Sequence, residues 1–176
     1  YINSGKEREE ISIELPNYGG SISALQAFGS DSPFKSYLCI MPGETLANIY
    51  EEWGNRLLEK NVRVFLQAKG KVNKGIRETL DKEPNMFFGY NNGITATASE
   101  IEYSVTKHGV AITRLVDFQI VNGGQTTASI YDAKRRGTLL KSVYVQMKLS
   151  VVGEEKSKEI VPKISQFANS QNKVST

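Results

Sequence analysis

The sequence has little of the side-chain chemistry on which most metal sites and hydrolytic enzymes depend. It contains one cysteine, Cys39, and one histidine, His108, among 176 residues. A disulfide within the chain is therefore impossible, and a zinc site built only from its cysteine and histidine side chains is excluded. A Ser-His-Asp or Cys-His arrangement would have to use His108, which lies in an expected hairpin turn at 107–109.

Long apolar runs are also missing. No uninterrupted apolar stretch approaches the roughly 20 residues that a membrane-spanning helix needs, and no basic, apolar and small-residue pattern of a secretory signal is visible at the start. With 39% hydrophobic and 23% charged residues, the chain can nevertheless bury a real core. These features predict a cytoplasmic globular protein without a membrane partner.

The two ends of the sequence suggest a larger protein. The chain opens at Tyr1 without a methionine and closes on Gln-Asn-Lys-Val-Ser-Thr at 171–176. We interpret it as a piece of a longer chain. The remaining segments of the full-length protein are therefore expected partners of this one.

The small net charge of +3 is unevenly distributed along the chain. The stretch from 56 to 82 holds eight basic and three acidic residues, a local net charge of +5. Such a basic stretch suits phosphate or nucleic acid, although charge runs are also common on solvated surfaces. Its basic residues are Arg56, Lys60, Arg63, Lys69, Lys71, Lys74, Arg77 and Lys82.

Hydrophobic periodicity predicts strands and helices that alternate along the chain. Strands are expected at 11–15, 37–41, 62–66, 94–105, 110–121 and 143–152. Helices are expected at 42–57, 72–80, 122–137 and 160–168. Pro162 would fit the last helix only in its first turn or at a kink, and residues 16–33, rich in Gly, Ser and Asn, are expected to form a loop. The predicted fold class is α+β (mixed α/β), with helices packed on a mixed sheet.

Two turns rich in asparagine and glycine carry the most distinctive chemistry. The residues of both turns tolerate left-handed backbone angles, and the second leads from a strand into a helix, whose first N–H groups favour an anion such as phosphate. A structural turn with a threonine cap is the alternative, since no Walker-type lysine follows. The candidate ligand-binding residues are Asn91, Asn92 and Gly93 in the first turn, and Asn122, Gly123, Gly124, Gln125, Thr126 and Thr127 in the second.

The shared composition of the two turns predicts that they lie together at one pocket. Gln125 stands where the second strand ends and the helix begins. Its side chain can either point into that pocket, where an amide could recognise the edge of a base or a ribose, or fold back to cap the turn.

Four stretches, at 61–66, 71–80, 88–96 and 117–130, resemble the AIPR family, whose name stands for abortive infection phage resistance. The blocks Tyr-Asn-Asn-Gly and Asn-Gly-Gly-Gln-Thr-Thr, in that order, are its specific motifs, and residues 167–174 resemble the next block. The resemblance implies a bacterial, cytoplasmic phage-defence protein. It also divides the chain into an unassigned N-terminal strand and loop region, 1–40, and an AIPR-like α/β domain, 41–176, that is incomplete at its C-terminus.

A second resemblance concerns the turn itself. The order of strand, Asn-Gly-x-x and helix is similar to the ParB and sulfiredoxin type of domain, whose turn holds nucleotide phosphates. Here Gln125-Thr126-Thr127 replaces the Arg or His-Arg pair of that pattern, so a charged contribution would come from Arg63, Lys74 or Arg77. The function implied is a sensor module that binds a nucleotide or nucleic acid, with a nucleotide as its candidate cofactor.

A metal-dependent nuclease is the alternative function. Glu154-Glu-Lys156 follows a predicted strand and Asp117 lies upstream, so two carboxylates could bind Mg²⁺ while the lysine positions a water. Glutamates at the start of a helix explain the same residues without a metal, because they complement the helix dipole. The leading interpretation includes no metal site, assigns no catalytic residue, and leaves open whether the chain is an enzyme.

Overall fold

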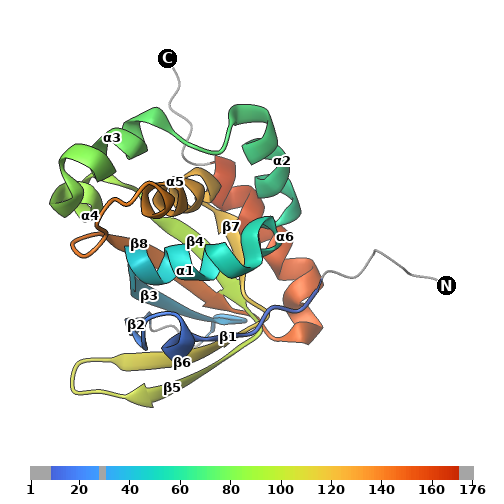
Figure 1. Ribbon diagram of the computed structural model, residues 1–176. Helices are drawn as coiled ribbons and strands as arrows, with labels where there is room; N and C mark the ends of the chain where they lie inside the picture. Colours follow the sequence, from blue (N-terminus) through green and yellow to red (C-terminus); the bar gives the residue numbers. More distant parts are fainter. Residues whose placement is uncertain (1–8, 28–30, 171–176) are drawn as a thin grey trace.

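A mixed sheet organises the residues that the computed structural model describes, 9–27 and 31–170 (Figure 1). Its strands are β1 (Ile13–Glu14), β2 (Ile22–Ala27), β3 (Lys35–Pro42), β4 (Ile94–Ala98), β5 (Glu100–Val105), β6 (Val110–Val116), β7 (Gln119–Asn122) and β8 (Tyr144–Val151). The order across the sheet is β1-β6-β2-β3-β8-β4-β7, and β5 pairs with β6 off this path. β4 and β8 run parallel, and the other paired strands run antiparallel.

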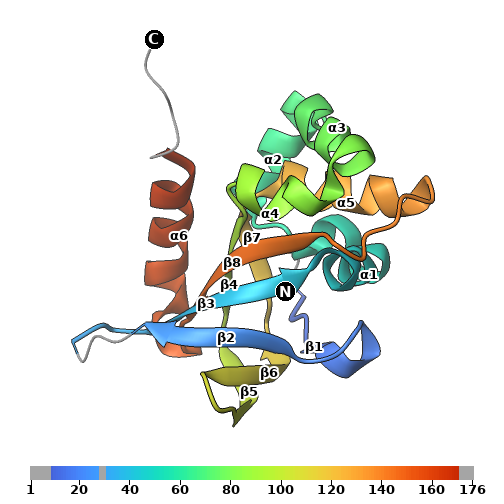
Figure 2. The same cartoon turned by 90° about the vertical axis from the view of Figure 1, so that its left-hand side faces the viewer.

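Helices cover both faces of this sheet, which confirms the predicted α+β class. They are α1 (Gly43–Trp53), α2 (Lys60–Lys69), α3 (Lys74–Lys82), α4 (Phe87–Tyr90), α5 (Gly124–Arg135) and α6 (Glu154–Ser170), with short 3₁₀ turns at Leu15–Asn17, Gly54–Leu57 and Pro84–Met86. Figure 2 shows α1 and α5 on one side of the sheet and α6 on the other. No helix in the described ranges is long and apolar enough to cross a membrane.

The core lies between the sheet and α1 and α5. The strand expected at 37–41 is confirmed as part of β3, in which Cys39 and Met41 are fully buried and Leu38 and Ile40 lie on the opposite, exposed face. Burial raises the pKa of the Cys39 thiol to about 12, so this cysteine stays protonated at neutral pH and packs as an apolar side chain.

The strand expected at 62–66 is wrong, because these residues lie within α2. Val62 and Leu66, four residues apart, are both buried, which is the spacing of one helical face. The carboxylate of Glu59 caps the helix by accepting a hydrogen bond from the N–H of Asn61 at 3.0 Å. The weak alternation of polar and apolar residues at 62–66 favours a strand, but the helix cap and the burial of Val62 and Leu66 on one helical face outweigh it.

The prediction of one continuous strand at 110–121 is also wrong, because the structure has two strands there. Asp117 adopts a left-handed φ of 56° and divides the segment into β6 and β7. The loop expected at 16–33 contains β2, although residues 28–30 lie outside the described part. The first strand is shorter than 11–15, since 15–17 forms a 3₁₀ turn.

Of the remaining expectations, the hairpin turn agrees with the structure and the position of Pro162 does not. The turn at 107–109 joins β5 and β6 as predicted, with the N–H of Thr106 donating to the carbonyl of Gly109 at 2.9 Å. Pro162, however, lies inside α6 rather than in its first turn. The stretch before residue 41 supplies β1, β2 and most of β3 to the same sheet, and β3 pairs with β8 along its whole length.

Candidate functional site

The two Asn/Gly turns lie side by side at one end of the β4–β7 pair. The first turn leads into β4, and the second connects β7 to α5. Because β4 and β7 are antiparallel neighbours, with Thr95 opposite Asn122, the start of one strand lies beside the end of the other. The hydroxyl of Thr126 donates to the Asn91 side-chain oxygen at 3.4 Å. The prediction that the turns share one pocket is confirmed.

Both turns line a cavity of about 710 Å³, which we name the turn cavity. Its other walls come from α2, α3, α4 and the C-terminal part of α6, and no lysine, arginine, aspartate or glutamate of the described chain lines it. Side-chain amides and aromatic rings dominate the lining instead. They are Asn61, Asn91, Asn92, Asn122, Gln125, Gln166 and Asn169, with the rings of Phe65 and Tyr90.

The glycines of the turns are required by close packing. Gly93 has a φ of 82°, and a Cβ there would overlap the backbone carbonyl oxygen of Gln146. Gly123 has a φ of 101°, and a Cβ would lie 2.5 Å from the Ile94 side chain. A Cβ on Gly124 would lie 2.9 Å from Val62. The glycine content of the turns is thus explained by backbone conformation and by contact with β8, β4 and α2.

Several polar residues of the turns also serve the fold. The side-chain oxygen of Asn91 accepts a hydrogen bond from the N–H of Gly93 at 2.7 Å. The fully buried Thr127 donates from its hydroxyl to the carbonyl of Gly123 at 3.0 Å. Asn122 donates to the side-chain oxygen of Asn169 at 2.7 Å. These bonds fix the shape of the cavity before any ligand binds.

The end of α6 is attached to β7 and α2 by residues that the sequence analysis did not select. Asn169 donates to the carbonyl of Val121 at 2.8 Å. The buried hydroxyl of Ser165 donates to the carboxylate of Glu59 at 3.0 Å. The resemblance of the block at 167–174 was the available signal for Asn169, although residues 171–174 of that block lie outside the described part.

The Gln125 side-chain amide does not cap its own turn but bonds to the connection between α2 and α3. Its Nε2 donates to the carbonyl of Gly70 at 3.0 Å, and its Oε1 lies 3.5 Å from the donor Nδ2 of Asn73. The residue lines the turn cavity and at the same time ties the connection between α2 and α3 to α5.

We therefore expect Gln125→Ala to lower the free energy of unfolding by about 1–2 kcal/mol, because the carbonyl and the amide that it pairs lose a partner. Urea denaturation of both proteins measures this change. Gln67→Ala, an exposed position on α2, is the control and should change stability by less than about 0.5 kcal/mol. Equal stability of wild type and Gln125→Ala would show that the tie is unimportant to the fold.

Other polar groups in the cavity have no partner within the described part of the chain. No hydrogen bond there involves the side chains of Asn61, Asn92 or Gln166, or the hydroxyl of Tyr90. The first N–H groups of α5, those of Gly124–Thr126, precede the first intrahelical bond, from Thr127 to Gly123. The cavity therefore offers donors, acceptors and ring faces to a ligand, all of them uncharged.

The candidate basic residues do not line this cavity. Arg63 donates to the carbonyl of Leu58 at 3.3 Å, and Arg77 lies 3.7 Å from Asp81 in an ion pair along α3. Lys74 is the exposed first residue of α3. Any contact of these three residues with phosphate would take place outside the turn cavity, and it stays a prediction.

The candidate residues of the nuclease alternative do not line one common pocket. Asp117 lines a pocket of about 220 Å³, and Lys156 lines a larger hollow of about 680 Å³. Glu154 begins α6, as expected for a glutamate near a helix start. Within the described ranges, no three His, Cys, Asp or Glu side chains gather closely enough to hold a metal ion. The nuclease alternative stays a prediction, and the described part of the chain supplies no cluster of side chains to bind its metal ion.

A family model described as AIPR protein matches residues 58–176, about two thirds of the chain. The matched region contains both turns, α5 and α6. Comparison with curated proteins and comparison with solved structures each found no match. These comparisons do not confirm the likeness to the ParB and sulfiredoxin type of domain.

Proposed function

We propose that this chain, which belongs to the AIPR family, binds a nucleotide or the end of a nucleic acid in the turn cavity. Membership of this family points to abortive infection as a defence against phage. In this proposal the chain is the sensor module of a bacterial, cytoplasmic defence protein. Binding, rather than catalysis, is its contribution.

The observation that carries the proposal is the uncharged, amide-rich lining of a cavity shared by two turns. A base presents donors and acceptors at its edge, and a carboxamide offers both. Asn92 and Gln166 line the cavity with exposed side chains. Discrimination between bases would rest on such amides, because a base with a different edge would cover them and leave their hydrogen-bonding groups unpaired.

Two aromatic side chains support the same ligand class. Phe65 on α2 and Tyr90 on α4 line the cavity while 53% and 57% exposed. Nucleic-acid bases stack on exposed rings of this kind. With no cation in the lining, the free N–H groups at the start of α5 are left to receive a phosphate.

Isothermal titration calorimetry with the four ribonucleoside monophosphates, with and without Mg²⁺, tests the proposal. We expect at least one to bind without Mg²⁺, and Tyr90→Ala to weaken its binding by about 1–3 kcal/mol, the usual value of one stacked base. Phe88→Ala is the matched control, since Phe88 lies on the same helix but outside the cavity lining. The absence of binding by all four would contradict the proposal, and binding that requires Mg²⁺ would favour the nuclease alternative.

A further inference from the structure

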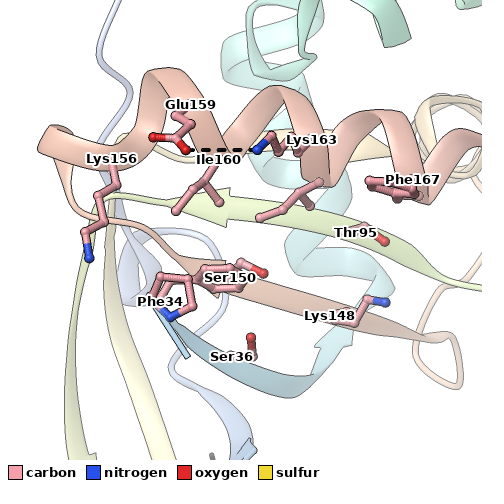
Figure 3. A pocket seen from close by; sticks show the side chains of 13 residues that line it. Phe34, Ser36, Thr95, Lys148, Ser150, Lys156, Glu159, Ile160, Lys163 and Phe167 are labelled. Atoms are coloured by element: carbon pink, nitrogen blue, oxygen red, sulfur yellow. Dashed lines mark ion pairs between the residues drawn. The ribbon is translucent and has the colours of Figure 1, made fainter. Parts of the chain in front are cut away.

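A second hollow lies on the other face of α6. It is a groove of about 680 Å³ between this helix and the sheet, and we name it the α6 groove (Figure 3). Ile160, Ile164 and Phe167 face it from α6, and Phe34 faces it from the segment before β3. Phe167 is 56% exposed, so the groove presents an aromatic ring that the fold itself leaves uncovered.

The charged side chains around this groove are mainly lysines. They are Lys148 on β8 and Lys156 and Lys163 on α6, with Glu159 as the acidic member. Lys163 lies 4.0 Å from Glu159 in an exposed ion pair. Lys148 and Lys156 form no ion pair within the described part of the chain, and Figure 3 shows them at opposite ends of the groove. The groove thus has the charge that complements a polyanion.

A chain of shared lining residues connects the α6 groove with the turn cavity. A smaller hollow joins them, because it shares Asn92 and Asn122 with the turn cavity and Lys148 and Phe167 with the groove. The path follows α6 from Lys156 to Phe167, a length of about 16 Å at 1.5 Å per residue. A ligand held in the turn cavity can therefore extend past several lysines.

We propose that the turn cavity and the α6 groove form one track for single-stranded nucleic acid. A terminal nucleotide occupies the uncharged turn cavity, and the following phosphates lie beside Lys148, Lys156 and Lys163. Bases along the groove contact Phe167 and Phe34, an arrangement of cations and rings that binds single strands. The inference rests on the proposed function and supplies the cations that the turn cavity lacks.

Fluorescence anisotropy with 5′-labelled oligouridylate and oligothymidylate of 12 nucleotides, beside calorimetry with mononucleotides, tests this track. We expect the 12-mer to bind at least tenfold more tightly than the mononucleotide in 50 mM salt. We expect Lys148→Ala/Lys156→Ala to reduce the slope of log K against log salt by about 0.7 for each lost contact. The same variant should bind the mononucleotide with unchanged affinity.

Two control variants sharpen the test. Lys107→Ala, in the β5–β6 hairpin, should leave the salt slope unchanged. Lys74→Ala/Arg77→Ala removes the basic pair on α3 that the sequence favoured. If this variant reduces the slope and Lys148→Ala/Lys156→Ala does not, the phosphates follow α3 and the inference is overturned.

Different results would contradict the single-strand track and the proposed nucleotide binding. Mononucleotide binding without any gain for the 12-mer would overturn the track and leave the proposed function intact. The absence of binding by both ligands would contradict both. Displacement of the labelled 12-mer by polyglutamate at equal charge concentration would show a general acidic-partner site and would also overturn the assignment to nucleic acid.

Discussion

Gly93→Ala is expected to destabilise the protein by about 2–5 kcal/mol. At a φ of 82°, a residue with a Cβ is strained, which costs about 1–2 kcal/mol. The added atom would also overlap the carbonyl oxygen of Gln146 on β8, and overpacking of this kind adds about 1–3 kcal/mol. Because the overlapped atom belongs to a strand backbone, a change of side-chain rotamer cannot relieve the contact.

Chemical denaturation monitored by circular dichroism measures this effect. Gly89→Ala is the matched control, because Gly89 lies in α4 with open space where its Cβ would be. A helical Gly→Ala change of this kind is neutral or stabilising by up to about 1 kcal/mol. Similar stabilities for Gly93→Ala and Gly89→Ala would show that the first turn is not held against β8.

Phe87→Ala is the second substitution that we expect to lower the free energy of unfolding strongly. Phe87 is 1% exposed at the start of α4, and its carbonyl accepts the N–H of Asn91 at 2.9 Å. Deleting a buried phenylalanine side chain typically costs about 3–5 kcal/mol. The loss should also release the first Asn/Gly turn, since α4 leads directly into it. We therefore expect a reduced free energy of unfolding together with weaker nucleotide binding.

The neighbouring ring provides the comparison. Phe88 is 44% exposed on the same helix, so Phe88→Ala should cost about 1 kcal/mol or less. Denaturation and calorimetry on the same preparations separate the two changes. If Phe87→Ala unfolds at the same denaturant concentration as Phe88→Ala, α4 does not depend on the core contact of Phe87.

The sequence predicted the fold class because its amphipathic segments are strong. The apolar residues of 42–57 recur at helical spacing and match α1, and the short apolar run at 37–41 matches β3, in which Leu38 and Ile40 are nevertheless exposed. The segment 62–66 was misassigned because five residues cannot separate a strand from a helix whose cap, Glu59, lies outside the window. Likewise, a single left-handed residue, Asp117, divides two strands without any change in hydrophobic pattern.

The candidate site was found by composition but only in part. Asparagine and glycine at unusual density identified both turns, since these residues tolerate the backbone angles that the turns require. The contributions of Ser165 and Asn169 could not be predicted, because only the tertiary packing of α6 brings them to β7 and α2. Charge density in the sequence favoured 56–82, whereas the lysines of the α6 groove, such as Lys148, are dispersed along β8 and α6.

The most direct test of the central claim, that the turn cavity holds a nucleotide, is a titration of the ¹⁵N-labelled protein followed by amide NMR spectra. With the monophosphate that calorimetry selects, we predict the largest chemical-shift changes at Gly93, Gly123 and Gly124, and at the adjoining amides of Gln125 and Thr126. The amide of Gly109, in the β5–β6 hairpin away from the cavity, should not move. Saturable shifts that are confined to other surfaces, with these amides unchanged, would contradict the account.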